Sequence, residues 1–170
     1  KPFAISWEKE HIPAIIAQWY GGEQEGYAIA DVLFGKVNPS GHLTYSFPQS
    51  AGHLPVYYNH LPSDKGFYKR PGSYRQSGRD YVFSSPEPLW AFGHGLSYTT
   101  FSFDKMRCDK NGYVLGDTIE VKVQIRNTGL RMGKEVVQLY IRDLVSSVVT
   151  PVKQLKAFVK PELKPGRSEE

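Results

Sequence analysis

Hydrophobic and polar side chains alternate with a period of two in the C-terminal part of the chain. The hydrophobic members of the clearest run are Ile119, Val121, Val123 and Ile125, and the polar members are Glu120, Lys122, Gln124 and Arg126. This alternation predicts a strand with one buried face. The period returns at Val137, Leu139 and Ile141, and residues 152–160 supply a further segment. Turn sequences lie at Asn127-Thr128-Gly129 and Lys164-Pro165-Gly166.

The N-terminal part has a different pattern. Residues 12–20 (IPAIIAQWY) are almost continuously apolar, which predicts a strand buried on both faces of a mostly parallel sheet. The Gly21-Gly22 turn leads into a predicted helix over residues 23–34. In this helix Tyr27, Ala30 and Phe34 form one apolar stripe, and Gly35 follows as a C-terminal cap.

A strand also follows the Asn38-Pro39-Ser40-Gly41 turn, where Leu43, Tyr45 and Phe47 alternate with polar residues. One strand–helix–strand unit cannot complete a parallel sheet, because each inner strand needs neighbours. We therefore expect residues 1–50 to be the end of an α/β domain that begins before Lys1.

Residues 51–100 have no regular period and are rich in aromatic residues and proline. Within them, the stretch from Arg79 to Phe101 predicts a packed connector between two structured bodies. Tyr57 and Tyr58 are candidates for stacking on sugar rings, and the alternative is that they pack on a neighbouring domain. Arg79 and Asp80 are further substrate-binding candidates, although an ion pair that fixes the connector also explains them.

Residues 101–170 predict an immunoglobulin-like β-sandwich of short strands. The 70 residues of this stretch are fewer than the roughly 100 of a seven-stranded sandwich, so we expect it to be incomplete. The predicted fold class is therefore an α+β fragment: the end of an α/β unit followed by an incomplete immunoglobulin-like β-sandwich.

Composition narrows the function classes. The net charge of +4 comes from scattered basic residues, so we expect no nucleic-acid partner. No apolar run approaches the length that spans a bilayer, so we expect no membrane partner. Cys108 is the only cysteine, and the five histidines have no metal-ligand spacing, so neither a disulfide nor a metal site is expected. We expect no cofactor. The compartment stays open, with a preference for the periplasm or the cell exterior.

The carboxylates do not form a persuasive catalytic pair. Glycosidases use two carboxyl groups at a defined separation, and the available ones are Glu23, Glu25, Asp31, Asp64, Asp80 and Glu87. Glu23 and Glu25 are explained as helix-start charges, and Asp31 as a helix-surface or capping residue. The nucleophile motif GxSxG is absent. We assign no catalytic residue.

Several motifs in order resemble glycoside hydrolase family three. They are IPAIIAQWYGGEQEGYAIADVLFGKVNPSG, then SFP, then PLWAFGHGLSYTTF; the later VKVQIRNTG, GKEVVQLYIRD and TPVKQLKAF resemble its fibronectin type III-like domain. The sequence departs from the family pattern at Gly21, at His42-Leu43-Thr44 and at Ala91, so the resemblance identifies the family but not the subfamily.

The resemblance implies the C-terminal part of a retaining exo-acting β-glucosidase or β-xylosidase. In that family the nucleophilic Asp lies on a TIM-like barrel. The acid/base Glu lies earlier in the α/β sandwich domain whose last part residues 1–50 resemble. Both regions precede Lys1, so neither residue maps onto this sequence. The implied partners are an oligosaccharide or aryl-glycoside substrate and the upstream domains of the same chain. The implied role of this piece is structural support. The rival hypothesis is a stand-alone carbohydrate-binding or adhesion module.

Overall fold

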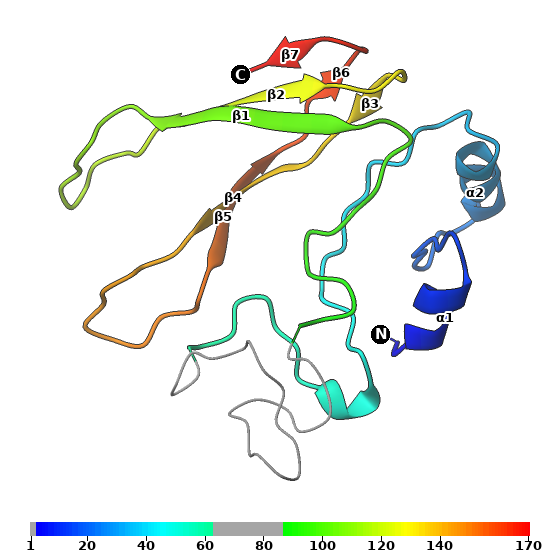
Figure 1. The fold of residues 1–170 in the computed structure, drawn as a ribbon, viewed down its shortest axis with the longest axis horizontal. Coiled ribbons are helices and arrows are strands. Elements are labelled where there is room, and N and C mark those ends of the chain that lie inside the picture. The colour runs from blue at the N-terminus through cyan, green and yellow to red at the C-terminus, as the bar shows by residue number, and fades with distance from the viewer. Residues whose placement is uncertain (1–2, 63–86) are drawn as a thin grey trace. The chain divides into compact units, whose positions relative to one another are not determined.

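The computed structural model describes residues 3–62 and 87–170. The chain forms two compact units, each assembled from segments that are distant in the sequence. The first comprises Lys1–Trp19, His42–Gly95 and Gln138–Phe158, and the second comprises Tyr20–Gly41, Leu96–Val137 and Val159–Glu170. The described residues form small sheets with few helices (Figure 1). Neither α-helix in these ranges has the length or hydrophobicity that crossing a bilayer requires.

The predicted helix over residues 23–34 is present as α2, Glu25–Leu33 (Figure 1). Glu25 lies in its first turn, where a negative charge complements the helix dipole. Gly35 follows the helix with φ of 72°, a conformation that residues with a Cβ rarely adopt, so the predicted glycine cap is confirmed. The described residues do not cover the apolar stripe, because Tyr27 is 74% exposed and Phe34 is 88% exposed.

The predicted strand over residues 12–20 is wrong for this chain. These residues form no ladder and are all exposed, including Ile16 at 50% and Tyr20 at 106%. A strand is defined by hydrogen bonds to a neighbouring strand, and no described segment pairs with this one. They follow a short helix that the pattern did not predict, α1, Ser6–His11.

The first unit has its core where residues 43–47 meet residues 89–94. The predicted strand at 43–47 is reduced to one antiparallel bridge between Phe47 and Trp90, with further backbone bonds between Leu43 and residues 93 and 94. The Phe47 and Trp90 rings meet edge to face at 5.7 Å, and Phe47 is 5% exposed. Tyr45 stacks on Phe47, and burial raises the pKa of the Tyr45 phenol. A short 3-10 helix, η1 (Ala51–His53), follows this segment.

The second unit contains a three-stranded antiparallel sheet in the order β1-β2-β7. Its strands are β1 (Phe101–Cys108), β2 (Val121–Asn127) and β7 (Ser168–Glu169) (Figure 1). The predicted alternation is confirmed within β2, where Ile125 is 3% exposed and lies opposite Phe103 while Arg126 is exposed. It is wrong at Ile119, which precedes β2 and is 48% exposed. The second unit also pairs β3 (Gly133–Lys134) with β6 (Glu162–Leu163). A further two-stranded sheet of β4 (Val137–Ile141) and β5 (Gln154–Val159) lies almost entirely in the first unit.

Asn127, which the sequence pattern assigns to a turn, is fully buried at the end of β2. Its side-chain amide donates to the carbonyl oxygens of Arg131 and Leu163, both at 2.8 Å. Its side-chain oxygen accepts from the Thr99 hydroxyl at 2.8 Å and from the Gly129 N–H at 3.1 Å. Because every polar atom of this amide has a partner, the buried side chain ties four segments of the second unit together.

Candidate functional site

The aromatic candidates Tyr57 and Tyr58 lie side by side in the sequence but in different surroundings. Tyr58 stacks on Phe92 with ring centroids 4.1 Å apart and an interplanar angle of 17°. Tyr140 of β4 meets the Tyr58 ring edge to face at 6.0 Å. The Tyr58 hydroxyl accepts a long hydrogen bond, 3.4 Å, from the Leu155 N–H of β5. Tyr58 is thus held by protein contacts, whereas Tyr57 is 65% exposed.

Tyr58, Phe92 and Tyr140 form an aromatic cluster, and hydrogen bonds connect its Tyr140 to a second residue of β4. The Tyr140 hydroxyl donates to the Gln138 side-chain oxygen at 2.5 Å, and the Gln138 amide donates to the Gly93 carbonyl at 3.1 Å. Burial, with a smaller contribution from Tyr58, raises the pKa of the Tyr140 phenol. The Lys153 ammonium lies 5.3 Å from the Tyr140 ring centroid, within cation–π range.

Sequence reasoning missed this face of β4. The alternation assigns Val137, Leu139 and Ile141 to the buried side, yet Gln138 and Tyr140 make the specific contacts to the segment around Gly93. The available signal was the residue type: the outward positions of β2 are charged or amide residues, whereas β4 has an aromatic residue there. An aromatic residue at a nominally outward position indicates a second packed face.

Arg79, Asp80 and the carboxylate Asp64 lie outside the described residues, within the stretch 63–86. Asp31 lies on α2, as expected, and its carboxylate forms an ion pair with Lys36 at 3.1 Å. Within residues 3–62 and 87–170, no group of three or more His, Cys, Asp or Glu side chains is arranged to hold a metal ion.

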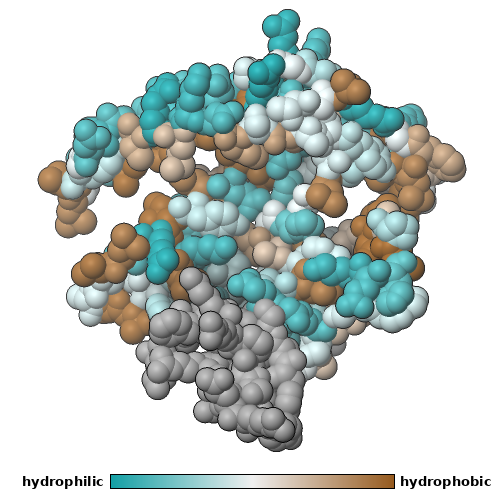
Figure 2. Space-filling model, viewed as in Figure 1, coloured by the Kyte–Doolittle hydropathy of each residue, from teal (hydrophilic) through white to brown (hydrophobic). Residues whose placement is uncertain are grey.

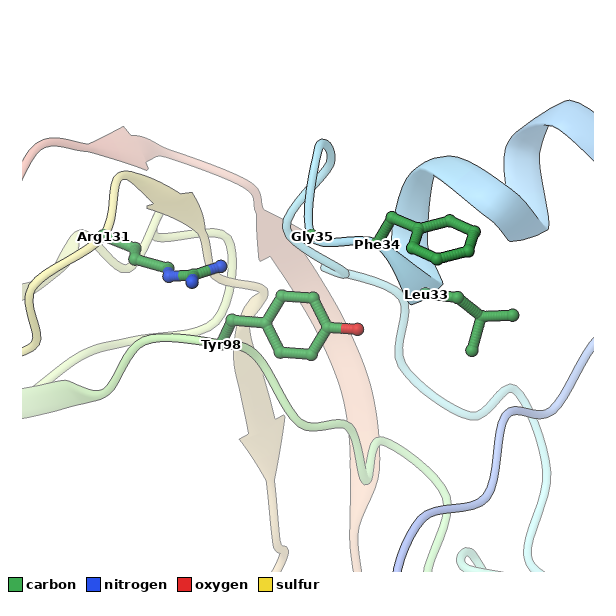
Figure 3. A pocket seen from close by; sticks show the side chains of 5 residues that line it. All are labelled: Leu33, Phe34, Gly35, Tyr98 and Arg131. Carbon is green, nitrogen blue, oxygen red and sulfur yellow. The ribbon is translucent and has the colours of Figure 1, made fainter.

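A pocket of about 480 Å³ lies in the second unit at the C-terminal end of α2. Its lining residues are Leu33, Phe34, Gly35, Tyr98 and Arg131 (Figure 3). The Tyr98 hydroxyl points toward the helix and donates to the Val32 carbonyl at 2.8 Å. The Arg131 guanidinium lies 5.8 Å from the Tyr98 ring centroid. This arrangement places a positive charge beside the negative end of the α2 dipole, so the pocket is explained by packing around the helix terminus.

His94 follows the bridged segment of the first unit. Burial, and then the charges of His42 and Lys9, lower its pKa below the ordinary value. The Lys9 ammonium donates to the Leu89 carbonyl at 2.9 Å and lies over the Trp90 ring at 5.3 Å. These contacts explain His94 and Lys9 as a structural cluster of the first unit.

Two family models match this chain. The model of the glycosyl hydrolase family 3 C-terminal domain matches residues 1–98, and that of the fibronectin type III-like domain matches residues 135–170. A β-xylosidase of Formosa agariphila is 44% identical over 168 residues, which are 99% of this chain and 22% of the relative. A periplasmic β-glucosidase of Salmonella typhimurium is 41% identical over 167 residues, 98% of this chain and 21% of the relative.

Solved structures give the same result. A β-glucosidase from Erythrobacter marinus superimposes with a TM-score of 0.88 at 41% identity, over 99% of this chain and 21% of that one. A β-glucosidase from Listeria innocua superimposes with a TM-score of 0.86 at 35% identity, over 99% of this chain and 23% of that one. The chain therefore spans about a fifth of the length of the relatives it matches.

Proposed function

Because this chain belongs to glycosyl hydrolase family 3, we propose that it forms the C-terminal, non-catalytic part of a retaining exo-acting β-glycosidase. The observation that carries this proposal is the pattern of coverage. The relatives align with 97–99% of this chain, while the aligned part is only 21–22% of their own length. The nucleophile and the acid/base carboxylate belong to the remaining four-fifths, and the substrates are terminal, non-reducing β-glucosides or β-xylosides.

The exposed N-terminal segment agrees with such a role. Residues 12–20 are apolar and lack a partner strand among the described residues, and α2 exposes Tyr27 and Phe34. Monomeric proteins rarely expose contiguous apolar surface of this kind. In the longer protein, residues 1–50 supply the last strand–helix–strand part of an α/β sandwich domain, and upstream strands cover these side chains. Residues 51–100 form the connector, and residues 101–170 belong to a fibronectin type III-like β-sandwich.

The contribution to catalysis is positional. A misplacement of about 1 Å between reacting groups costs about 100-fold in rate, so a support that keeps two domains in register affects turnover without touching the substrate. The chain's own residues then act through packing and hydrogen bonds, and no described residue takes part in a chemical step.

The test compares the complete gene product that contains this chain with the 170-residue chain alone. The complete product is expected to release nitrophenol from an aryl β-glucoside or β-xyloside, with retention of the anomeric configuration by NMR. The isolated chain is expected to release none. Turnover by the isolated chain at about 1 s⁻¹ or faster, an ordinary enzymatic rate, contradicts the non-catalytic role. A complete product inactive on both substrates contradicts the glycosidase assignment.

Tyr57, Tyr58, Arg79 and Asp80 remain proposed substrate contacts. Of the two that the structure describes, Tyr57 is the more accessible, since Phe92 covers one face of the Tyr58 ring. This exposed aromatic residue also favours the second candidate function, carbohydrate binding without hydrolysis. Calorimetry of the complete product with cello- and xylo-oligosaccharides tests it: Tyr57→Ala is expected to weaken binding by about 1–2 kcal/mol if the ring stacks on a sugar. Unchanged affinity removes Tyr57 from the set.

A further inference from the structure

The β1–β2 loop, residues 109–120, joins β1 to β2 and contains the dipeptide Asn111-Gly112. Both residues are exposed, and the loop forms the left-hand end of the β1–β2 hairpin in Figure 1. At the same place in Figure 2, hydrophilic and hydrophobic residues lie next to each other on the surface shown. Solvent therefore reaches this dipeptide.

The backbone does not require glycine at position 112. The φ of Gly112 lies outside the left-handed region, and apart from its chain neighbours a Cβ there would meet no described atom within 4 Å. Gly116 in the same loop is different, because its φ of 98° is one that residues with a Cβ rarely adopt. The absence of a side chain at position 112 therefore leaves the peptide bond after Asn111 unshielded, with a backbone that can change its conformation.

The buried Asn127 shows what keeps an asparagine inert. Its amide nitrogen donates to two backbone carbonyls, and the N–H of the next residue, Thr128, donates to the Thr100 carbonyl at 2.8 Å. These bonds would have to break before the side-chain amide could react with that backbone nitrogen. In the part of the chain that the structure describes, no hydrogen bond holds the Asn111 side chain or the Gly112 N–H.

The sequence contains two further asparagines, and the residue after each one hinders attack by its backbone nitrogen on the amide. Asn38 precedes Pro39, which has no backbone N–H. Asn59 is exposed, but the side chain of His60 limits the backbone conformations that bring the two reacting groups together. Asn111 is the only asparagine in the sequence that precedes glycine.

We propose that Asn111 is a site of spontaneous deamidation, a covalent modification whose only co-reactant is water. The Gly112 backbone nitrogen loses its proton and attacks the side-chain carbon Cγ of Asn111, so a new C–N bond closes a succinimide ring. The Cγ–Nδ2 bond breaks, and the side-chain nitrogen leaves as ammonia with that proton. Water then opens the ring: cleavage at Cγ gives aspartate, and cleavage at the main-chain carbonyl carbon gives isoaspartate. Nothing is oxidised or reduced.

The product changes both the charge and the backbone length of the loop. The new carboxylate at position 111 directly follows Lys110, whose ammonium pairs with Asp117 at 3.4 Å. Isoaspartate adds one methylene to the main chain between Lys110 and Tyr113, where the Lys110 N–H donates to the Tyr113 hydroxyl at 3.2 Å. The Tyr113 hydroxyl itself donates to the Asp109 carboxylate at 2.6 Å. We therefore expect deamidation to loosen the hydrogen bonds that close the loop.

The experiment follows deamidation in the complete gene product that contains this chain, held at mildly alkaline pH. Peptide mass spectrometry measures the rate at each asparagine, and chromatography separates isoaspartate from aspartate. We expect Asn111 to react at least about tenfold faster than Asn59, which corresponds to about 1.4 kcal/mol in activation free energy, with isoaspartate as the main product. The matched variant is Gly112→Ala, which the free space around position 112 accommodates. Because its Cβ restricts the backbone, this variant is expected to slow the reaction at Asn111 by at least about tenfold.

Rates at Asn111 and Asn59 that agree within about twofold overturn the proposal. So does an Asn111 that reacts in urea but not in the native protein, because the loop is then covered in the complete product. A Gly112→Ala protein that deamidates at the parent rate also overturns it, and if that variant does not fold, the comparison of Asn111 with Asn59 decides. Deamidation does not depend on glycoside hydrolysis, so either result leaves the proposed function as it stands.

Discussion

Strand β2 and residues 12–34 both have a strong hydrophobic pattern. The described residues bury the hydrophobic side chains of β2 but leave those of residues 12–34 exposed. On β2, Ile125 lies opposite Phe103 and is 3% exposed, and Asn127 at its end has a partner for every polar side-chain atom. In residues 12–34, Tyr20 is 106% exposed and Phe34 is 88% exposed. The difference teaches that hydrophobic periodicity reports burial in the whole protein, and that a segment's partners need not lie in the stretch that contains it.

The largest expected effect tests the self-contained side of this comparison. Asn127→Ala removes an amide that satisfies two carbonyl groups, a hydroxyl and an N–H in a buried site. Because each stranded polar group costs about 1–3 kcal/mol, partly relieved by relaxation, we expect about 4 kcal/mol of destabilisation in the complete product. Urea unfolding measures it. Asn111→Ala, on the exposed loop, is the control and is expected to stay within about 0.5 kcal/mol. An equal, small effect at both positions contradicts the structural role of Asn127.

The next effect tests the unsatisfied side. If upstream residues cover α2, Phe34→Ala is expected to destabilise the complete product by about 3 kcal/mol, because it then leaves a cavity in a core. The same measurement on Leu115→Ala, a residue that is 107% exposed in the β1–β2 loop, is expected to give about 0.5 kcal/mol or less. If the Phe34→Ala protein is as stable as the parent, the apolar stripe of α2 is exposed in the complete product too, and the proposed cover by upstream residues is wrong.

The smallest effect concerns the exposed β1–β2 loop. The hydrogen bond to the Asp109 carboxylate raises the pKa of Tyr113 to about 12, and the same bond lowers the pKa of Asp109. The contribution of Tyr113 to the free energy of unfolding is complete below its unfolded pKa of about 10, and it is lost as the pH rises through about 12. That of Asp109 is present above its unfolded pKa and is lost as pH falls through its lowered value. The Asp109→Asn substitution is expected to return the pKa of Tyr113 toward its ordinary value, and NMR titration of labelled tyrosine measures that pKa. A Tyr113 titration midpoint that is the same in both proteins contradicts the pairing.

Much of the fold could be predicted from sequence where the partner is near in the chain. The helix α2, its glycine cap and the β2 alternation follow from local rules of spacing and backbone freedom. The strand at 12–20 failed because a strand depends on a neighbour that the described residues do not supply. Asn127 looks like a turn residue in sequence, and only the three-dimensional arrangement shows that its amide reaches Leu163, far along the chain.

The candidate site was less predictable for the same reason. Tyr58 was predicted as a substrate-stacking candidate, and its contacts with Phe92 and Tyr140 join positions that no period connects. The exposed fraction of Tyr57 likewise depends on what lies around it. Residue type suggests a chemistry, whereas the identity of the neighbours decides between packing and binding.

Gly93 has a consequence for how this protein can vary. It has φ of 82°, and a Cβ at this position would collide with the Gln138 side chain and come within 2.9 Å of the Tyr140 hydroxyl. A smaller residue at position 138 would therefore remove the collision but not the backbone strain, because residues with a Cβ rarely adopt this φ. Glycine at position 93 is thus required for two independent reasons, its backbone conformation and the close approach of β4.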